Sequence, residues 1–375
     1  MKNILLHTPE GVRDIYGKEY ARKLAVEQKL QNAIHCFGYE DIQTPSIEFF
    51  DVFSKEIGTT PSKELYKFFD KEGNTLVLRP DFTPSIARCA AKYYMDETQP
   101  IRFCYKGNTF INAGSLQGKL KEITQMGAEL MNDDSLEADA EMIALVVESL
   151  LQTGLKEFQI SIGEVEYFKG LCEEAGLSTE TAEDLRELIS GKNLFGAEEL
   201  LKERNVCIEE RERLLKVSDF FGSVEILDEA ENQVHNETSK QAVLHLKKLY
   251  EVLKDYGVEK YISFDLGMLS KYHYYTGVIF KAFSYGVGDA IVKGGRYDKL
   301  LGCFGKSAPA IGFAVVIDDL LLSLERQNGT YQEKPVVQKI TYTESNYTEK
   351  LKTAQALRSE GKRVALIPES ERTEV

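Results

Sequence analysis

The feature that most constrains this fold is a long helical stretch that interrupts a strand-rich chain. Residues 168–258 are charged and rich in helix formers. Just before them, apolar and polar residues alternate over 158–162, which is typical of a half-buried strand. Strand formers return at 261–265. We therefore predict one α+β core made of 1–167 and 259–330, with 168–258 as a helical insertion.

The first part of the core begins with a turn-rich entry and a helix. Apolar residues recur at helical spacing over about 18–37, and Gly38 follows where a C-cap belongs. A short strand is expected at 39–45. The segments 75–79 and 101–105 are rich in strand formers and are also predicted strands.

A second strong helix is predicted over about 135–152. Asp134 and Glu137 have the spacing of a capping box, and Gly154 closes the segment. This helix and the strands on either side of it complete an α+β pattern.

The last third of the chain contains a glycine pair, a helix and a short tail. Gly294–Gly295 is expected to form a tight turn, and 315–326 an apolar helix. Residues 331–375 form a third, small α/β segment with a strand–helix–strand pattern, at 336–343, 347–360 and 363–367.

Charge and composition exclude several classes of protein. The chain has 375 residues and a net charge of −14, which disfavours a nucleic-acid partner, since such proteins carry basic surfaces. No apolar run approaches the roughly 20 residues that a membrane span needs, and the N-terminal apolar run is too short for a signal peptide. We expect a cytoplasmic protein that has no membrane partner.

Neither the cysteines nor the histidines suggest a metal or a catalytic centre. The six cysteines are scattered, with no C-x-x-C and no histidine at zinc-ligand spacing, so we expect neither a metal nor a cofactor. The five histidines are far apart in the sequence, and no nucleophile motif or Walker loop is present. The segment 294–298 would be only a weak phosphate-loop signal by itself.

Taken in order, several segments together resemble one family. They are Thr8–Ile15, Gly38–Pro45, Leu78–Thr83, Gln125–Glu129, Tyr274–Gly277, Gly294–Asp298 and Pro309–Ala314. The series is similar to the catalytic core of histidyl-tRNA synthetase, a class II aminoacyl-tRNA synthetase, and covers about 5–325. The resemblance implies a class II synthetase-like antiparallel sheet with flanking helices and a helical insertion, in agreement with the pattern above.

The chain departs from the synthetase at three arginines that the resemblance assigns to ATP and to substrate carboxylate. Ile111, Ser270 and Asp319 occupy those positions. Adenylate formation needs fixed guanidinium groups beside the α-phosphate, and loss of one such donor typically costs about 2.7–4 kcal/mol. We therefore predict that this chain has no catalytic residues and does not form an adenylate.

The amino-acid pocket implied by the resemblance looks better preserved. Asp81 and Thr83 would hold the α-amino group, Gln125 would bridge the amino and carboxylate groups, and Glu129 would accept from the imidazole N–H. The full predicted histidine site is Asp81, Thr83, Gln125, Glu129, Tyr274, Tyr275 and Tyr297. The alternative is an inherited but inert network of polar core residues.

A synthetase-like chain without these arginines and with a short tail resembles the regulatory subunits of ATP phosphoribosyltransferase. The resemblance implies a non-catalytic subunit that senses free histidine. Its partner would be a short-form catalytic subunit, a glycosyltransferase that performs the first step of histidine biosynthesis. It also implies a homodimer, formed through about 18–48, within a hetero-oligomer that does not bind tRNA. The alternatives are an active histidyl-tRNA synthetase and a stand-alone histidine sensor.

Overall fold

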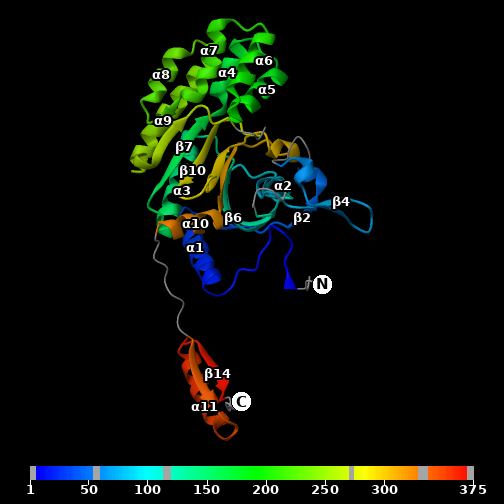
Figure 1. Cartoon of the computed structure of the whole chain (residues 1–375), viewed down its shortest axis with the longest axis vertical. Helices are drawn as coiled ribbons and strands as arrows, with labels where there is room; N and C mark the ends of the chain where they lie inside the picture. The colour runs from blue at the N-terminus through cyan, green and yellow to red at the C-terminus, as the bar shows by residue number, and fades with distance from the viewer. Residues whose placement is uncertain (1–5, 54–59, 113–119, 270–273, 328–336, 370–375) are drawn as a thin grey trace. The chain divides into compact units, whose positions relative to one another are not determined.

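The chain is divided into two compact units. A computed structural model describes residues 6–53, 60–112, 120–269, 274–327 and 337–369 (Figure 1). The first unit comprises Met1–Ile15 and Lys23–Gly329, and the second comprises Tyr16–Arg22 and Thr330–Val375. Each unit is described by itself below.

The core of the first unit is a nine-stranded sheet in the order β1-β5-β6-β12-β11-β10-β7-β9-β8. The pairs β1–β5 and β7–β9 are parallel, and the other neighbours are antiparallel. The strand bounds are β1 (Glu40–Asp41), β5 (Ile101–Phe110), β6 (Glu122–Met131), β7 (Phe158–Glu164), β8 (Phe221–Gly222), β9 (Ile262–Asp265), β10 (Val278–Ser284), β11 (Val292–Arg296) and β12 (Ala310–Val316). The pairing of β5 with β6 is the longest in the sheet and extends over ten residue pairs.

A smaller antiparallel sheet lies earlier in the chain. It has the order β2-β4-β3, with β2 (Ile47–Phe49), β3 (Lys67–Phe69) and β4 (Thr75–Leu78). β4 leads into the Pro80–Phe82 turn and so delivers the chain to the start of α2.

Helices of the first unit fall into two groups. The core helices are α1 (Gly17–Cys36), which begins in the other unit, α2 (Thr83–Tyr93), α3 (Leu136–Thr153) and α10 (Ile317–Arg326). The insertion contains α4 (Val165–Glu174), α5 (Thr179–Ser190), α6 (Leu194–Glu203), α7 (Ile208–Lys216), α8 (Ile226–Gln233) and α9 (Glu237–Asp255). Figure 1 shows α4–α9 gathered beside β7 and β10. The inserted segment also adds strand β8 to the sheet edge, beside β9.

Helix α9 meets the core through a buried ionic cluster. His245 lies between two buried carboxylates, with its Nε2 3.3 Å from Asp139 Oδ2 and its Nδ1 3.0 Å from Glu164 Oε2. Asp139 also pairs with Arg296 of β11 at 2.6 Å. Burial lowers the pKa of His245, but its two carboxylate partners outweigh burial and raise that pKa to about 9.

The second unit contains a parallel two-stranded sheet. Strands β13 (Gln338–Tyr342) and β14 (Val364–Pro368) are joined by helix α11 (Tyr347–Ser359). This is the strand–helix–strand pattern predicted for the tail. No helix within the described parts of either unit combines the length and the apolar composition needed to cross a membrane.

The predicted start of the 135–152 helix needs a correction. The N-cap is Ser135, whose Oγ accepts from the Ala138 N–H at 3.2 Å, so the predicted capping box from Asp134 is not formed. Asp133 in turn accepts from the Ser135 hydroxyl and fixes its orientation. The helix ends at Gly154 with φ of +96°, as predicted.

The glycine pair is not a turn. Gly294 and Gly295 lie inside β11, paired with Phe280 and Ile279 of β10. A Cβ at Gly294 would overlap the Phe280 ring, and a Cβ at Gly295 would lie 2.7 Å from the Tyr275 ring. The two glycines are therefore required by close approach of aromatic rings to the strand and not by chain reversal. Similarly, the predicted 315–326 helix begins only at Ile317, because β12 continues through Val316 in register with β6.

Candidate ligand-binding site

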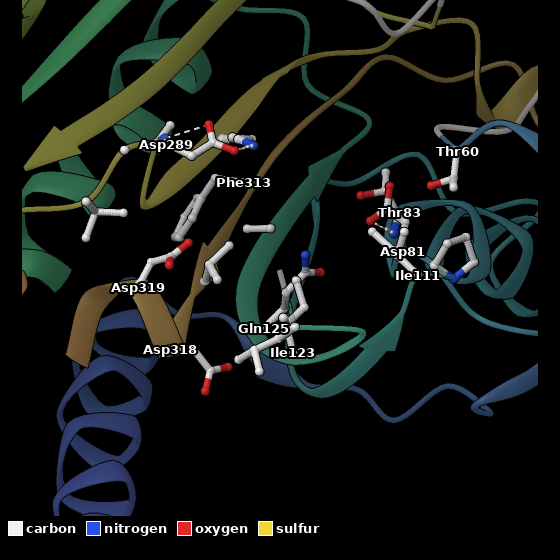
Figure 2. Close-up of a pocket in the computed structure, with 18 of the residues that line it drawn as sticks. Thr60, Asp81, Thr83, Ile111, Ile123, Gln125, Asp289, Phe313, Asp318 and Asp319 are labelled. Atoms are coloured by element: carbon white, nitrogen blue, oxygen red, sulfur yellow. Dashed lines mark hydrogen bonds and ion pairs between the residues drawn. The ribbon is translucent and has the colours of Figure 1, made fainter. Parts of the chain in front are cut away.

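A large cavity opens beside the centre of the nine-stranded sheet. Its volume is about 1270 Å³, and its wall includes residues of β6, β11, β12 and the starts of α2 and α10. Figure 2 shows Asp81 and Thr83 on one side and Asp318 and Asp319 on the other, with Gln125 between them. We call these two sides the α2 end and the α10 end.

The α2 end is organised around Glu129 of β6. This side chain is 1 % exposed, and it lies behind the cavity wall. The Thr83 hydroxyl donates to Glu129 Oε1 at 2.8 Å, and the Tyr297 hydroxyl donates to Oε2. Gly312 of β12 pairs with Glu129 of the neighbouring strand β6, and any side chain at Gly312 would overlap the carboxylate. The Glu129 carboxyl therefore orients two hydroxyl groups that face the ligand space.

Burial changes the acidity of this carboxyl. Removal from water raises the pKa of Glu129 to about 8, although the hydrogen bonds from Tyr297 and Thr83 favour the ionised form. Asp81 raises it slightly further by charge repulsion. Burial also raises the pKa of Tyr297, so its hydroxyl stays protonated. The cluster holds a proton that an exposed glutamate would have lost.

Asp81 and Thr83 reach the cavity because α2 begins there. Pro84 stands in the first turn of α2, and Asp81 Oδ1 accepts from the Phe82 N–H at 2.6 Å and the Thr83 N–H at 3.4 Å. Pro suits this position because the first helical N–H groups have no partner within the helix. The carboxylate of Asp81 is thus fixed at the helix start, on the cavity wall.

Gln125 of β6 supplies an unsatisfied acceptor. Its Oε1 atom is buried and has no hydrogen-bond partner among the described residues, and the residue lines the cavity. A buried acceptor without a donor costs roughly 1–3 kcal/mol, so a ligand N–H placed against it would recover free energy.

Three tyrosines form an aromatic wall. The rings of Tyr274 and Tyr275 are 4.6 Å apart, and Tyr274 meets Tyr297 edge-on at 5.9 Å. All three line the cavity. Six of the seven predicted site residues therefore line the cavity, and the seventh, Glu129, is hydrogen-bonded behind Thr83 and Tyr297.

The arginine of the Leu78–Thr83 motif has a structural role. Arg79 is 5 % exposed and donates to the backbone oxygens of Thr44 and Asn108 at 2.8 and 2.9 Å. Its guanidinium lies 3.8 Å from the centre of the Phe82 ring. It ties the small sheet to β5 and is not among the residues that line the cavity.

The α10 end has a different chemistry. Asp318 and Asp319 stand in the first turn of α10, where carboxylates interact favourably with the helix dipole. Asp318 accepts from the Thr124 N–H at 3.1 Å and lies 3.9 Å from Arg13. A free helix N-terminus binds phosphate well, but here two carboxylates of the same helix oppose an anion.

Two cations among the described residues that line this end are also engaged. Lys293 pairs with Asp289 at 2.9 Å, and Arg326 donates to the backbone oxygen of Gly286. Ile111, at one predicted arginine position, lines the cavity as an aliphatic wall residue. Ser270, at another, lies outside the described residues.

Two residues of the site were not singled out from the sequence. Tyr105 stacks on Phe82 at 4.4 Å and donates to the backbone oxygen of Phe313 at 3.3 Å. The sequence does indicate a role for Tyr105, because it shares a strand face with Ile101 and Phe103, and a buried tyrosine hydroxyl needs a hydrogen-bond partner. Gly312 had no signal by itself, because only the register with Glu129 reveals its role.

Comparisons with known proteins identify the family and the fold. The family profile described as histidyl-tRNA synthetase matches residues 11–320. A crystal structure of histidyl-tRNA synthetase from Nostoc has the same fold, with a TM-score of 0.80 at 21 % identity, over 98 % of this chain and 87 % of that one. Fold and site together define a protein of the class II aminoacyl-tRNA synthetase type, and the predicted fold class is confirmed.

More similar relatives carry a different name. Proteins named ATP phosphoribosyltransferase regulatory subunit are 42 % identical in Acetivibrio thermocellus, over 95 % of this chain and 85 % of the relative, and 41 % identical in Ruminiclostridium cellulolyticum, over 96 % and 86 %. A Bacillus halodurans crystal structure described as an ATP phosphoribosyltransferase regulatory subunit/histidyl-tRNA synthetase has a TM-score of 0.89 at 33 % identity, over 100 % of this chain and 96 % of that one. This chain belongs to the family of ATP phosphoribosyltransferase regulatory subunits, as the sequence resemblance predicted.

Proposed function

We propose that this chain is a non-catalytic regulatory subunit that binds free histidine at the α2 end of the cavity. It passes that signal to a short-form ATP phosphoribosyltransferase catalytic subunit, for feedback inhibition of histidine biosynthesis. The observation that carries the proposal is the Glu129 cluster, in which one buried carboxyl orients the Thr83 and Tyr297 hydroxyls.

The hydrogen-bonding groups of this end match those of histidine. Because the Thr83 and Tyr297 hydroxyls donate to Glu129, their oxygens can accept from a ligand. The buried Gln125 Oε1 is a further acceptor. Histidine offers matching donors in its α-ammonium group and its imidazole N–H. We propose that Tyr297 accepts from the imidazole and that Gln125 and Asp81 receive the ammonium group.

In this arrangement Glu129 acts through its neighbours. The direct bond from the imidazole N–H to Glu129 that the resemblance implied would use a second lone pair of an oxygen that already accepts from Thr83 or Tyr297, or would need one of these hydroxyls to turn away. Either way, a ligand that donates at this end favours the ionised form of Glu129, because both hydroxyls must then point toward its carboxylate.

The α10 end argues against a synthetase activity. ATP would bring several negative charges beside Asp318 and Asp319, and the lining cations Lys293 and Arg326 are held by Asp289 and Gly286. Repulsion by these two carboxylates disfavours an adenylate transition state, which fixed guanidinium groups beside the phosphates would stabilise. This supports a regulatory role over that of an active histidyl-tRNA synthetase.

Calorimetry with histidine tests the sensing site. Wild-type protein should bind histidine but not leucine, because a site built on hydrogen bonds rejects a ligand that lacks them. Glu129→Gln should weaken binding by about fivefold or more, the equivalent of roughly 1 kcal/mol, since its amide can donate to a hydroxyl oxygen and occupy it. No heat from wild type at millimolar histidine, or equal titrations for both proteins, would refute histidine sensing at this site.

Size-exclusion chromatography with a short-form catalytic subunit tests the partner. The two proteins should co-elute as a hetero-oligomer, in which we propose that this chain is a homodimer, and the catalytic activity should rise. Histidine should then lower that activity in the wild-type complex and less in the Glu129→Gln complex. Separate elution at micromolar concentration with unchanged activity would contradict the regulatory assignment and favour a stand-alone sensor.

A further inference from the structure

Three potential metal ligands from separate segments meet at the β1 edge of the nine-stranded sheet. His35 lies in the last turn of α1, Asp41 in β1 and Cys104 in β5. Strands β1 and β5 are parallel, and their register places Asp41 directly beside Cys104. The His35, Asp41 and Cys104 ligand atoms all lie within 4.8 Å of one another. We propose that these three residues form a binding site for a zinc-class divalent cation.

The separations are close to those of a coordinated ion. His35 Nε2 is 3.1 Å from Asp41 Oδ2, and Cys104 Sγ is 3.4 Å from Asp41 Oδ1. Tetrahedral zinc with ordinary bond lengths places its ligand atoms about 3.3–3.8 Å apart. The imidazole and the thiol therefore lie at about this spacing from the Asp41 carboxylate, on its two different oxygens. The ligand atoms of the three residues, all within 4.8 Å of one another, need only to draw together around one ion.

The chemistry of the ligand set selects the ion. A thiolate, an imidazole and a carboxylate together suit zinc, whereas calcium and magnesium prefer oxygen ligands alone. One thiolate and one carboxylate neutralise the two positive charges of the ion. On binding, the S–H bond of Cys104 breaks, an S–Zn bond forms and the proton leaves to water. The fourth position of the tetrahedron is left for water.

The site is open to solvent on one side and buried on the other. The His35 and Asp41 side chains are 41 % and 58 % exposed, which gives the ion a path of entry. Cys104 is 2 % exposed and supplies the soft ligand from beneath. Gln31, one helical turn before His35, donates to Asp41 Oδ1 at 2.9 Å and so orients the carboxylate. Such an outer contact is typical of metal sites.

Cobalt is the probe for this site, because Co²⁺ takes tetrahedral thiolate-containing sites and absorbs visibly. Titration of Co²⁺ into the reduced full chain should produce a thiolate-to-cobalt charge-transfer band together with intense visible bands, and Zn²⁺ should abolish both. Cys104→Ser should remove the charge-transfer band. His35→Gln, at an exposed position that leaves folding intact, should raise the Co²⁺ dissociation constant at least about tenfold, the loss that follows even from removing an outer-shell partner.

Cys36→Ser is the matched control. Cys36 is an exposed thiol next to His35 in the same helix, and its removal should leave the cobalt spectrum and affinity unchanged. A charge-transfer band that survives in Cys104→Ser but disappears in Cys36→Ser would overturn the proposal, as would the absence of any band in wild type. If Cys104→Ser fails to fold, an unchanged affinity in His35→Gln overturns it equally.

Discussion

The two ends of the cavity lie beside the same nine-stranded sheet, but their side chains favour ligands of opposite charge. Toward the α2 end, the Thr83 and Tyr297 hydroxyls both donate to Glu129, and Gln125 adds a buried acceptor. At the α10 end, carboxylates of the helix itself occupy the place where an anion would bind. The comparison teaches that hydroxyl groups around a buried carboxyl and carboxylates at a helix start give two parts of one cavity different preferences for a ligand's charge.

The difference also separates two physical demands. An amino acid needs a few matched donors and acceptors, which a single strand face with its neighbouring loop can provide. A nucleotide triphosphate needs several fixed cations from different elements. Loss of any one cation weakens a nucleotide site greatly, whereas the proposed amino-acid site depends on a compact network around Glu129.

The largest expected effect concerns the α10 end. ATP–pyrophosphate exchange with histidine and magnesium should stay at background, because each missing guanidinium typically costs about 10²–10³ in rate. Restoring arginine together at 111, 270 and 319 tests whether charge is sufficient. Exchange well above background in wild-type protein would remove the proposed difference between the two ends.

The next effect is a loss of stability with rising pH. Glu129 has a folded pKa of about 8 and an unfolded value near 4.5, so its favourable contribution is complete below the unfolded value and is lost as pH rises through 8. Its free-energy contribution should fall by about 1.4 kcal/mol per pH unit between these values. Urea unfolding of wild type and Glu129→Gln across this range should give converging stabilities at low pH and diverging ones at high pH.

His245 should act in the same direction in a higher pH window. Its folded pKa of about 9 lies above the ordinary value of 6.5, so its contribution is full below 6.5 and disappears as pH rises through 9. The stability lost in His245→Gln should therefore be largest near neutral pH and smallest at pH 10.

For the Glu129 prediction, parallel curves of stability against pH for Glu129→Gln and wild type would show that Glu129 does not retain its proton in the folded state.

A smaller effect is expected from one methyl group behind the α2 end. Gly312→Ala would place its Cβ against the Glu129 carboxylate and should cost about 1–3 kcal/mol of stability, together with histidine affinity. Gly302→Ala is the control, because a Cβ there meets nothing within 4 Å. Denaturant unfolding and calorimetry would compare the two, and equal behaviour would contradict the tight packing around Glu129.

The smallest effects compare one substitution at each end. Tyr297→Phe should weaken histidine binding about fivefold, because one hydrogen bond of about 1 kcal/mol is lost. Asp319→Asn should change the histidine dissociation constant less than about twofold, since a half-buried charge at the opposite end of the cavity lies beyond the first contacts of the proposed ligand. A larger effect of Asp319→Asn than of Tyr297→Phe would mean that histidine occupies the α10 end.

Periodic elements of this fold could be predicted from the sequence, and contacts between them could not. The long helix before Gly38 and the helix ending at Gly154 follow from local spacing and glycine caps, and both are found within a residue or two. The predicted strand at 39–45 is reduced to the two residues of β1, because only these pair with β5. Conversely, β5 extends to Phe110, since β6 pairs with its whole length.

The candidate site shows the same limit. Its residues were predicted through the resemblance and stay predictions as ligand contacts, but their grouping around one cavity could not be obtained from spacing alone. The position of Glu129 behind Thr83 and Tyr297 depends on the register of β6 with β12. In the same way, no spacing rule brings His35, Asp41 and Cys104 together, because three separate segments supply them.

The glycines of the central sheet have a consequence for mutational tolerance. Side chains at Gly127, Gly294, Gly295 and Gly312 would meet Tyr105, Phe280, Tyr275 and Glu129 respectively. Three aromatic rings and one carboxylate therefore lie directly against bare backbone, and the close packing of this part of the sheet depends on residues that have no side chains. In a saturation-mutagenesis map these positions should stand out as the least substitutable in β6, β11 and β12, whereas Gly222 at the sheet edge, where a Cβ meets nothing within 4 Å, should accept most residues.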